Sequence, residues 1–202
     1  VVSGGSKRLL GRPVAGAPLS VAALAGIVAY EPAELVLTAR AATPLAMIEH
    51  ELTARGQRLA FEPPRFGPLL GTHDRQTIGG VVATNLAGSR RVSAGAARDH
   101  FLGCTAVNGR GETFSAGGRV VKNVTGYDLP KVLAGSWGPL AVLTEVTVRV
   151  VPLPETELTL VARAADPVAA VAWMTAALGS PYDVSAAAFD PCLLCLLRIE
   201  GF

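Results

Sequence analysis

TIGGVVATNLAGSRR, residues 77–91, is a run of small side chains that ends in two adjacent arginines. Glycine is used where the backbone takes a positive φ or lies close against a ligand, because it has no Cβ. Gly79 and Gly80 therefore predict either a sharp turn or a backbone surface that contacts a large anionic molecule. Arg90 and Arg91 are predicted to form a solvated basic turn.

A second glycine cluster, SGGSK, occupies residues 3–7, after two valines that resemble the end of a strand. Backbone N–H groups in such a turn can converge on an anion, and Ser6 adds a hydroxyl. Downstream of the first cluster, Thr84 and Asn85 could hydrogen-bond a polar ligand. Neither cluster has the G-x-G-x-x-G or the G-x-x-x-x-G-K-[ST] spacing, which excludes the Rossmann and P-loop fingerprints. From the residues alone, a plain turn and a phosphate-bearing ligand both remain open.

The composition is that of a globular protein with a substantial core. Half of the 202 residues are hydrophobic, 17% are charged and the net charge is +2, so the charge does not argue for a nucleic-acid partner. The uncharged stretch 13–30 contains two prolines and two glycines, which predicts a buried strand with its entry loop and no transmembrane segment. Three cysteines provide no disulfide framework and favour a cytoplasmic protein. Cys192 and Cys195 form a C-x-x-C pair, but without a second ligand pair nearby they predict no metal site.

Several segments have clear secondary-structure patterns. Thr43 is predicted to cap the start of a helix, and Gly56 is predicted to end it. Residues 101–115 have the β-rich runs and the Asn-Gly turn of a hairpin. Residues 142–150 alternate between apolar and polar faces, which predicts a strand with one buried side. Residues 61–95 have little periodicity and much glycine and proline, which predicts a long functional loop.

A domain boundary is predicted at Pro152 and Pro154, directly after that strand. Residues 1–154 would form the first domain, and residues 155–202 the start of a second. In the second, a strand, an apolar helix at 167–178 and two further strands follow one another, as in the first half of a ferredoxin-like unit. The chain is therefore expected to be a fragment, with the amino-terminal part of the first domain missing and the second domain truncated.

Eight motifs follow one another along the chain: GGSK, EPAELVLTARAATPLA, FEPPRFG, TIGGVVATNLAG, RDHFLG, VNGRGE, VVKNVTGYDL and GSWGPLAVLTEVTVRVVPLP. Together they resemble the FAD-binding domain of the vanillyl-alcohol oxidase (PCMH-type) flavoprotein family. The resemblance covers almost the whole chain, and KNVTGYD with GSWGPLAVLTEV is its most specific part. It implies an α+β fold of two α/β subdomains with FAD between them, followed by a cap domain over the flavin.

The resemblance also assigns the cofactor contacts. Residues 3–7 would form the pyrophosphate loop, residues 77–85 a second wall, and residues 138–142 a backbone approach to the adenine end. The residues assigned to FAD are Ser3, Gly4, Gly5, Ser6, Lys7, Thr77, Ile78, Gly79, Gly80, Ala83, Thr84, Asn85, Gly138, Ala141 and Val142. The small side chains would let the backbone lie against the ribityl-diphosphate chain. Because the first glycine loop has no His and Cys104 falls in a predicted strand, the FAD would be bound non-covalently.

Within the family, the likeness is to FAD-binding subunits of bacterial glycolate oxidases. It implies oxidation of a small 2-hydroxy acid by hydride transfer to the flavin, with electrons passed to a partner. The implied partners are the D subunit and the iron–sulfur F subunit, and any membrane association would come through them. Two alternatives remain open: a non-catalytic flavin scaffold or electron relay, and another flavin dehydrogenase of this fold, such as a D-lactate dehydrogenase or the FAD subunit of a molybdenum hydroxylase.

No catalytic base is predicted. His73 and His100 are the only histidines near the expected site, and neither has a pattern that assigns it the role. As it stands, the fragment is expected to show no turnover and to hold FAD poorly.

Overall fold

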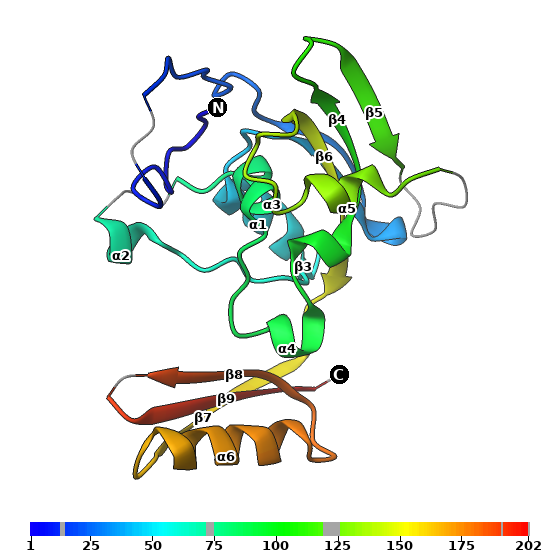
Figure 1. The fold of residues 1–202 in the computed structure, drawn as a ribbon. Helices are drawn as coiled ribbons and strands as arrows, with labels where there is room; N and C mark the ends of the chain where they lie inside the picture. The colour runs from blue at the N-terminus through cyan, green and yellow to red at the C-terminus, as the bar shows by residue number, and fades with distance from the viewer. Residues whose placement is uncertain (13–14, 72–74, 119–125, 191, 202) are drawn as a thin grey trace.

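Strand β6 (Val142–Pro152) is the centre of the larger sheet, and every strand that pairs with it is antiparallel. The sheet order is β1-β2-β6-β4-β5, with β3 pairing the end of β6. The other strands are β1 (Ile27–Glu31), β2 (Val36–Arg40), β3 (Gln57–Leu59), β4 (Phe101–Val107) and β5 (Thr113–Gly117). Figure 1 shows this sheet in the upper part of the molecule. The computed structural model describes residues 1–12, 15–71, 75–118, 126–190 and 192–201.

For residues 142–150, the predicted buried face is confirmed over the second half of the strand, but Thr147 on the predicted polar face is buried as well. Val146, Val148 and Val150 are fully buried. At the start of β6 the prediction is wrong, because Leu143 is buried while Thr144 is only partly covered. The register with β4 shifts between Thr105 and Ala106, and such an irregularity moves the next side chain to the other face.

Helix α1 (Leu45–Thr53) buries Leu45, Ile48 and Leu52 against the sheet. Helix α3 (Ile78–Thr84) packs on β2 and β6 in the same core. The remaining helical segments of this part are η1 (Pro32–Glu34), α2 (Gly67–Leu70), α4 (Arg91–Ala94), η2 (Ala97–His100) and α5 (Leu129–Leu133). The described part of the stretch 61–95 is thus not one long loop, because α2, α3 and α4 occur in it. Helix α3 is stabilised by the burial of Ile78, Val81 and Val82, since tertiary packing supplies most of the stability of short helices.

Two local predictions are wrong. Thr43 does not cap α1; its hydroxyl donates to the carbonyl oxygens of Arg40 and Gly26, and Pro44 holds the cap position. Residues 13–30 do not form a buried strand. Within the described part of that stretch, only Ile27 to Tyr30 belong to β1, which lies at the edge of the sheet with half-exposed side chains.

The hairpin prediction is confirmed by β4 and β5, which pair from Gly103–Gly117 to Val107–Thr113. In the turn, the side-chain oxygen of Asn108 accepts hydrogen bonds from the amides of Arg110 and Glu112. This local bonding is why Asn is favoured in turns. The motif VVKNVTGYDL follows β5, and most of it, within residues 119–125, lies outside the described residues. His73 lies outside the described residues too.

A second sheet has the order β7-β9-β8, from β7 (Thr156–Arg163), β8 (Val184–Asp190) and β9 (Leu194–Gly201). Both outer strands pair antiparallel with β9, so they run parallel to each other on either side of it. They are joined through α6 (Pro167–Leu178), which Asp166 caps by accepting a hydrogen bond from the Ala169 amide. This is the β-α-β-β order predicted for residues after Pro154. The two-domain division itself stays a prediction.

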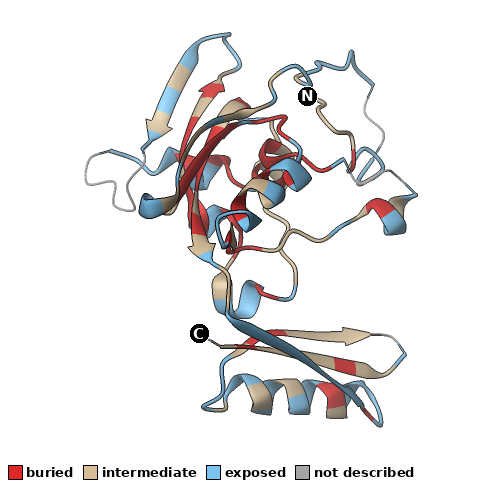
Figure 2. Ribbon diagram, turned by 180° about the vertical axis from the view of Figure 1, so that it is seen from behind, coloured by how far each residue is buried: buried red, intermediate tan, exposed pale blue. Residues whose placement is uncertain are grey.

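The two sheets differ in how much they bury. Figure 2 shows the buried residues concentrated in the larger sheet and its helices, whereas the second sheet and α6 are mostly exposed or intermediate. All eight residues of β7 are exposed. The second core cluster contains only Ala164, Ala170 and Cys195 among the described residues, with Phe189 packed against them.

The two sheets meet through charged side chains. Arg90, at the start of α4, is only 8% exposed and is bonded to Glu200 of β9. The prediction of a solvated basic turn is therefore wrong for Arg90, because a carboxylate far along the chain covers it. Arg91 is exposed, as predicted.

Candidate functional site

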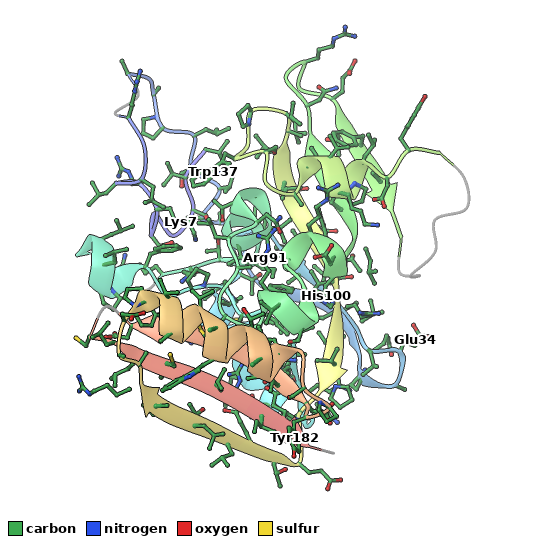
Figure 3. The ribbon with its side chains drawn as sticks, turned by 60° about the horizontal axis from the view of Figure 1, so that its bottom comes forward. Lys7, Glu34, Arg91, His100, Trp137 and Tyr182 are labelled. Carbon is green, nitrogen blue, oxygen red and sulfur yellow. The ribbon has the colours of Figure 1, made fainter. Side chains whose placement is uncertain are left out.

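A cavity of about 700 Å³ opens between the amino-terminal loop, α3 and the segment before β6. This volume lies within the roughly 300–1,000 Å³ of small-molecule and cofactor sites. Lys7 and Trp137, which both line the cavity, are labelled in Figure 3 at the end of the molecule that carries the amino-terminal loop. The cavity is the place where the predicted binding segments come together.

The two glycine clusters touch each other, although Ser3 and Thr77 are 74 positions apart. The hydroxyl oxygens of Ser3 and Thr77 are 2.8 Å apart. Lys7 Nζ donates to the Gln76 side-chain oxygen at 3.5 Å. Residues 3–7 and residues 77–80, predicted as a loop and a second wall, therefore lie against each other at the cavity.

The glycines of the two clusters have different structural roles. A Cβ on Gly79 would lie 2.7 Å from both the Cβ and the carbonyl oxygen of Ala41, so Gly79 is required for α3 to pack on the sheet. A Cβ on Gly4 would overlap the carbonyl oxygen of Arg75. A Cβ on Gly80 would meet only the Thr77 hydroxyl, at 3.2 Å, and Gly80 lines the cavity. Gly80 is thus the glycine whose missing side chain leaves space for a ligand.

The amides of the two clusters are also used differently. In α3, the amides of Ile78 and Gly79 donate to the carbonyls of Thr43 and Ala41, and the Gly80 amide faces the Thr77 hydroxyl. Among the residues that the structure describes, none accepts a hydrogen bond from the amides of Gly4 or Gly5. Free backbone N–H groups in a turn with a positive φ, here 72° at Gly5, are the donors that bind anions. The first cluster therefore has the character of a phosphate loop, and the second that of a packed wall.

The positive charge of the site does not come from Arg90 and Arg91. Within the described lining of the cavity, the charged side chains are Lys7, Arg8, Arg12 and Arg75, all cationic. A cleft lined by one sign of charge attracts ligands of the opposite sign. Sequence reasoning missed three of these four residues. The R-x-x-x-R spacing of Arg8 and Arg12, directly after SGGSK, was the available signal for two of them.

Nearly all of the predicted FAD-binding residues line the cavity. The exceptions are Ile78 and Asn85. Ile78 is fully buried in the core, and Asn85 ends α3 with a φ of 49° while its side-chain oxygen accepts a hydrogen bond from the Arg98 amide. The residues brought together are Ser3, Gly4, Gly5, Ser6, Lys7, Thr77, Gly79, Gly80, Ala83, Thr84, Gly138, Ala141 and Val142.

His100 is not part of the described cavity lining. Its Nε2 bonds to the carbonyl oxygen of Ala94 at 2.7 Å, and its ring packs on Phe61. Nε2 must therefore carry the proton, and Nδ1 can accept from Arg149 at 3.5 Å. Burial, with the positive charge of Arg149, lowers the pKa of His100. These contacts give His100 a structural role beneath β6.

The cysteines also lie apart from the described lining of the cavity. Cys104 is buried in β4, and burial raises its pKa to about 11. Cys192 is exposed, whereas Cys195 is buried in β9, and neither forms a disulfide. A thiol with a raised pKa is a poor nucleophile, so Cys104 is not suited to a covalent flavin bond.

These features match a known family. The FAD binding domain family matches residues 1–117, which include both glycine clusters and all four cationic residues of the described lining. The chain belongs to this family. The predicted resemblance to an FAD-binding flavoprotein family is confirmed, and so is the predicted cofactor, FAD.

Two curated relatives cover different extents of this FAD-binding chain. Glycolate oxidase subunit GlcE of Escherichia coli K12 is 48% identical over 155 residues, 77% of this chain and 43% of the relative. A D-lactate dehydrogenase of Archaeoglobus fulgidus is 42% identical over 76 residues, 38% of this chain and 17% of the relative. This chain thus spans less than half the length of either relative.

The fold is shared with a solved alkyldihydroxyacetonephosphate synthase. The match has a TM-score of 0.69 at 17% identity and covers 88% of this chain and 37% of that one. The predicted α+β, FAD-binding fold class is confirmed. Within the described part of the FAD-binding chain, no helix is both long and apolar enough to cross a membrane.

FAD fits this cavity on three counts. The free amides of Gly4 and Gly5 and the cationic side chains suit its diphosphate. The open face at Gly80 leaves room for backbone contact with the extended part of the molecule. The apolar lining, including Leu133, Val142 and Leu143, suits its ring systems.

Proposed function

We propose that this chain is the FAD-binding subunit of a glycolate oxidase or dehydrogenase, which oxidises a small 2-hydroxy acid and passes the electrons to partner subunits. The observation that carries the proposal is the cavity built from the two glycine clusters in a chain that is 48% identical to a glycolate oxidase subunit over most of its length. The D-lactate dehydrogenase relative supports the same substrate class, because glycolate and lactate are both 2-hydroxy acids.

In this function, the residues of the chain bind and orient the cofactor. Bound FAD supplies a two-electron acceptor for the carbon that bears the hydroxyl group. Gly4 and Gly5 would donate to the diphosphate, and Lys7 with Arg8 would neutralise its charge. Ser3 and Thr77, held against each other, keep the two walls in register. Fixed donors of this kind bind an anion without reorganising.

A second candidate function is a flavin scaffold or electron relay whose partner performs the chemistry. The observation that favours it is the character of the cavity. Its described charged side chains are anion-binding lysine and arginine residues, and His100 is engaged with Ala94 beneath β6. A general base must reach the proton that it removes. In this candidate, the base and the carboxylate-binding group belong to another subunit, for which the D subunit and the iron–sulfur F subunit of glycolate oxidases are the proposed partners.

The test compares the chain alone, the chain with its partner subunits, and the complex that contains a flavin-deficient Gly80→Val chain. Reduction of a dye acceptor is followed with glycolate and with D-lactate. We expect a flavin absorption band and glycolate-dependent reduction in the complete parent complex, and no turnover by the chain alone. Parent-level activity in the Gly80→Val complex would contradict a role for this flavin. Activity with D-lactate but none with glycolate would contradict the proposed substrate.

A further inference from the structure

Trp137 has a backbone conformation that a tryptophan rarely adopts. Its φ is 61°, between Gly135 at 80° and Gly138 at 94°. A positive φ is costly for a bulky side chain, because the Cβ crowds the neighbouring carbonyl. A residue kept in such a conformation must be held there, and positions of this kind cluster at functional sites.

Two hydrogen bonds to the end of α3 hold this segment in place. The Gly135 amide donates to the Val82 carbonyl at 3.1 Å, and the Trp137 amide donates to the Ala83 carbonyl at 2.8 Å. Ala83 itself lines the cavity. The loop is therefore tied to the cavity wall, and the position of Trp137 relative to Gly80 is set by α3.

The Trp137 side chain is only partly covered by the rest of the protein. Trp137 is 52% exposed, although it lines the cavity together with Leu133 and Val142. Among the described residues, Phe61 and His100 form a ring contact, and no aromatic ring contacts that of Trp137. A large, partly exposed aromatic residue thus lines the cavity, and planar heteroaromatic rings stack well on aromatic side chains. Figure 3 shows the side chain beside the amino-terminal loop that bears Lys7.

We propose that Trp137 is a stacking residue for one of the two ring systems of FAD. The strained loop presents the indole at the rim of the cavity, while the Gly4–Gly5 turn and Lys7 bind the diphosphate. The proposal rests on FAD binding by this family and not on the substrate proposed above, so a wrong substrate would leave it intact.

The test measures FAD affinity in the full-length protein after its flavin has been removed. Flavin fluorescence follows the titration of the parent and of Trp137→Phe, Trp137→Ala and Trp137→Gly. Stacking of a heteroaromatic base is worth enough that removing the ring should weaken FAD binding about ten-fold, while Phe should stay within about three-fold of the parent. Trp173→Ala on α6, also exposed, is the matched control and should bind FAD like the parent.

The two small variants separate stacking from loop geometry. Alanine keeps the unfavourable φ, whereas glycine relieves it. We expect both variants to lose FAD affinity alike, with the apoprotein of Trp137→Gly unfolding at a temperature no lower than that of Trp137→Ala. If Trp137→Gly binds FAD as tightly as the parent, the residue is only a loop element and the proposal is overturned.

The ring system is identified by competition with fragments of the cofactor. ADP keeps the adenine ring, and FMN keeps the flavin ring. A Trp137→Ala effect on ADP supports stacking on adenine, and an effect on FMN supports stacking on the flavin. An unchanged affinity for FAD, ADP and FMN would overturn the proposal, as would a parent protein that binds no FAD at all.

Discussion

The guanidinium of Arg90 lies 2.6 Å from the carboxylate of Glu200, and this ion pair joins the start of α4 to the last strand of the second sheet. Arg58 binds the same carboxylate from β3. Arg198 Nε, on β9, is 3.3 Å from it, and the Arg198 guanidinium also bonds to Glu62. The side chain of Glu200 is 5% exposed. One buried carboxylate therefore holds three arginines at the junction between the sheets.

Glu200→Gln should destabilise the protein strongly, because arginines at a buried junction lose their counter-charge. Removing one partner of a buried ion pair typically costs about 3–5 kcal/mol in the free energy of unfolding. Chemical denaturation with circular dichroism measures the change. The control is Glu49→Gln in the exposed pair with Arg65, where less than about 1 kcal/mol is expected. Equal losses of stability at the two sites would contradict the conclusion that the buried Glu200 ion pairs stabilise the protein more than an exposed pair does.

The stability difference between the parent and Glu200→Gln should depend on pH. Burial alone would raise the pKa of Glu200, but its hydrogen bonds and the charges of Arg58 and Arg90 hold the pKa below its usual value. The stabilisation is then complete above the pKa of an unfolded glutamate, about 4.3, and is lost as the pH falls through the lower folded value. The stability difference between parent and Glu200→Gln should therefore shrink only at such acidic pH. A difference that vanishes near neutral pH would contradict this.

His100 should make the protein less stable as the solution becomes mildly acidic. Burial, with the charges of Arg149 and Arg90, lowers its pKa against the effect of the bond to Ala94. The unfolded chain then binds a proton before the folded one does, so stability is present above the unfolded pKa of about 6.5 and falls as the pH decreases toward the folded value. Melting temperatures between about pH 7.5 and pH 5 should fall less in His100→Gln than in the parent.

His50→Gln, at an exposed position, is the matched control for the substitution of a histidine by glutamine. His100→Gln should also retain FAD, because His100 lies outside the described lining of the cavity. Loss of flavin with an unchanged melting temperature would show that His100 acts at the cofactor after all.

Adjacent glycines in α3 should fail in different ways. Gly80→Val should abolish FAD retention with a circular dichroism spectrum near that of the parent, because the new side chain would occupy space at the cavity and would meet only the Thr77 hydroxyl. Gly79→Ala should instead lower stability, by about 1–3 kcal/mol for overpacking, since its Cβ would press on Ala41. Flavin absorbance and thermal unfolding separate the two effects. A Gly80→Val protein with a full complement of flavin would show that the cavity is not the binding site.

The FAD should be bound without a covalent bond. The amino-terminal glycine loop contains no histidine, and Cys104 has its pKa raised to about 11 by burial in β4. Acid precipitation of the flavin-loaded protein should leave the yellow colour in the supernatant, and Cys104→Ala should behave identically. Colour that stays in the pellet of the parent but not of the variant would identify Cys104 as the attachment point.

The sequence by itself determined the elements whose pattern is local. The alternation of β6, the Asn108 turn between β4 and β5, and the apolar run of α6 each depend on neighbours within a few residues. The glycine clusters were recognisable for the same reason, since missing side chains are visible in the sequence. Family resemblance then assigned them to FAD, and all but two of the predicted residues line one cavity.

Only the tertiary structure decided what each of these residues contacts. Gly79 packs on Ala41, while Gly80 lines the cavity. This difference depends on how α3 lies on the sheet, and the sequence of two adjacent glycines does not reveal it. Arg90 is buried and Arg91 exposed because Glu200, 110 positions away, reaches the first and not the second. Periodicity is a property of neighbouring residues, whereas burial, ion pairing and ligand contact depend on partners that the folded chain brings from far along the sequence.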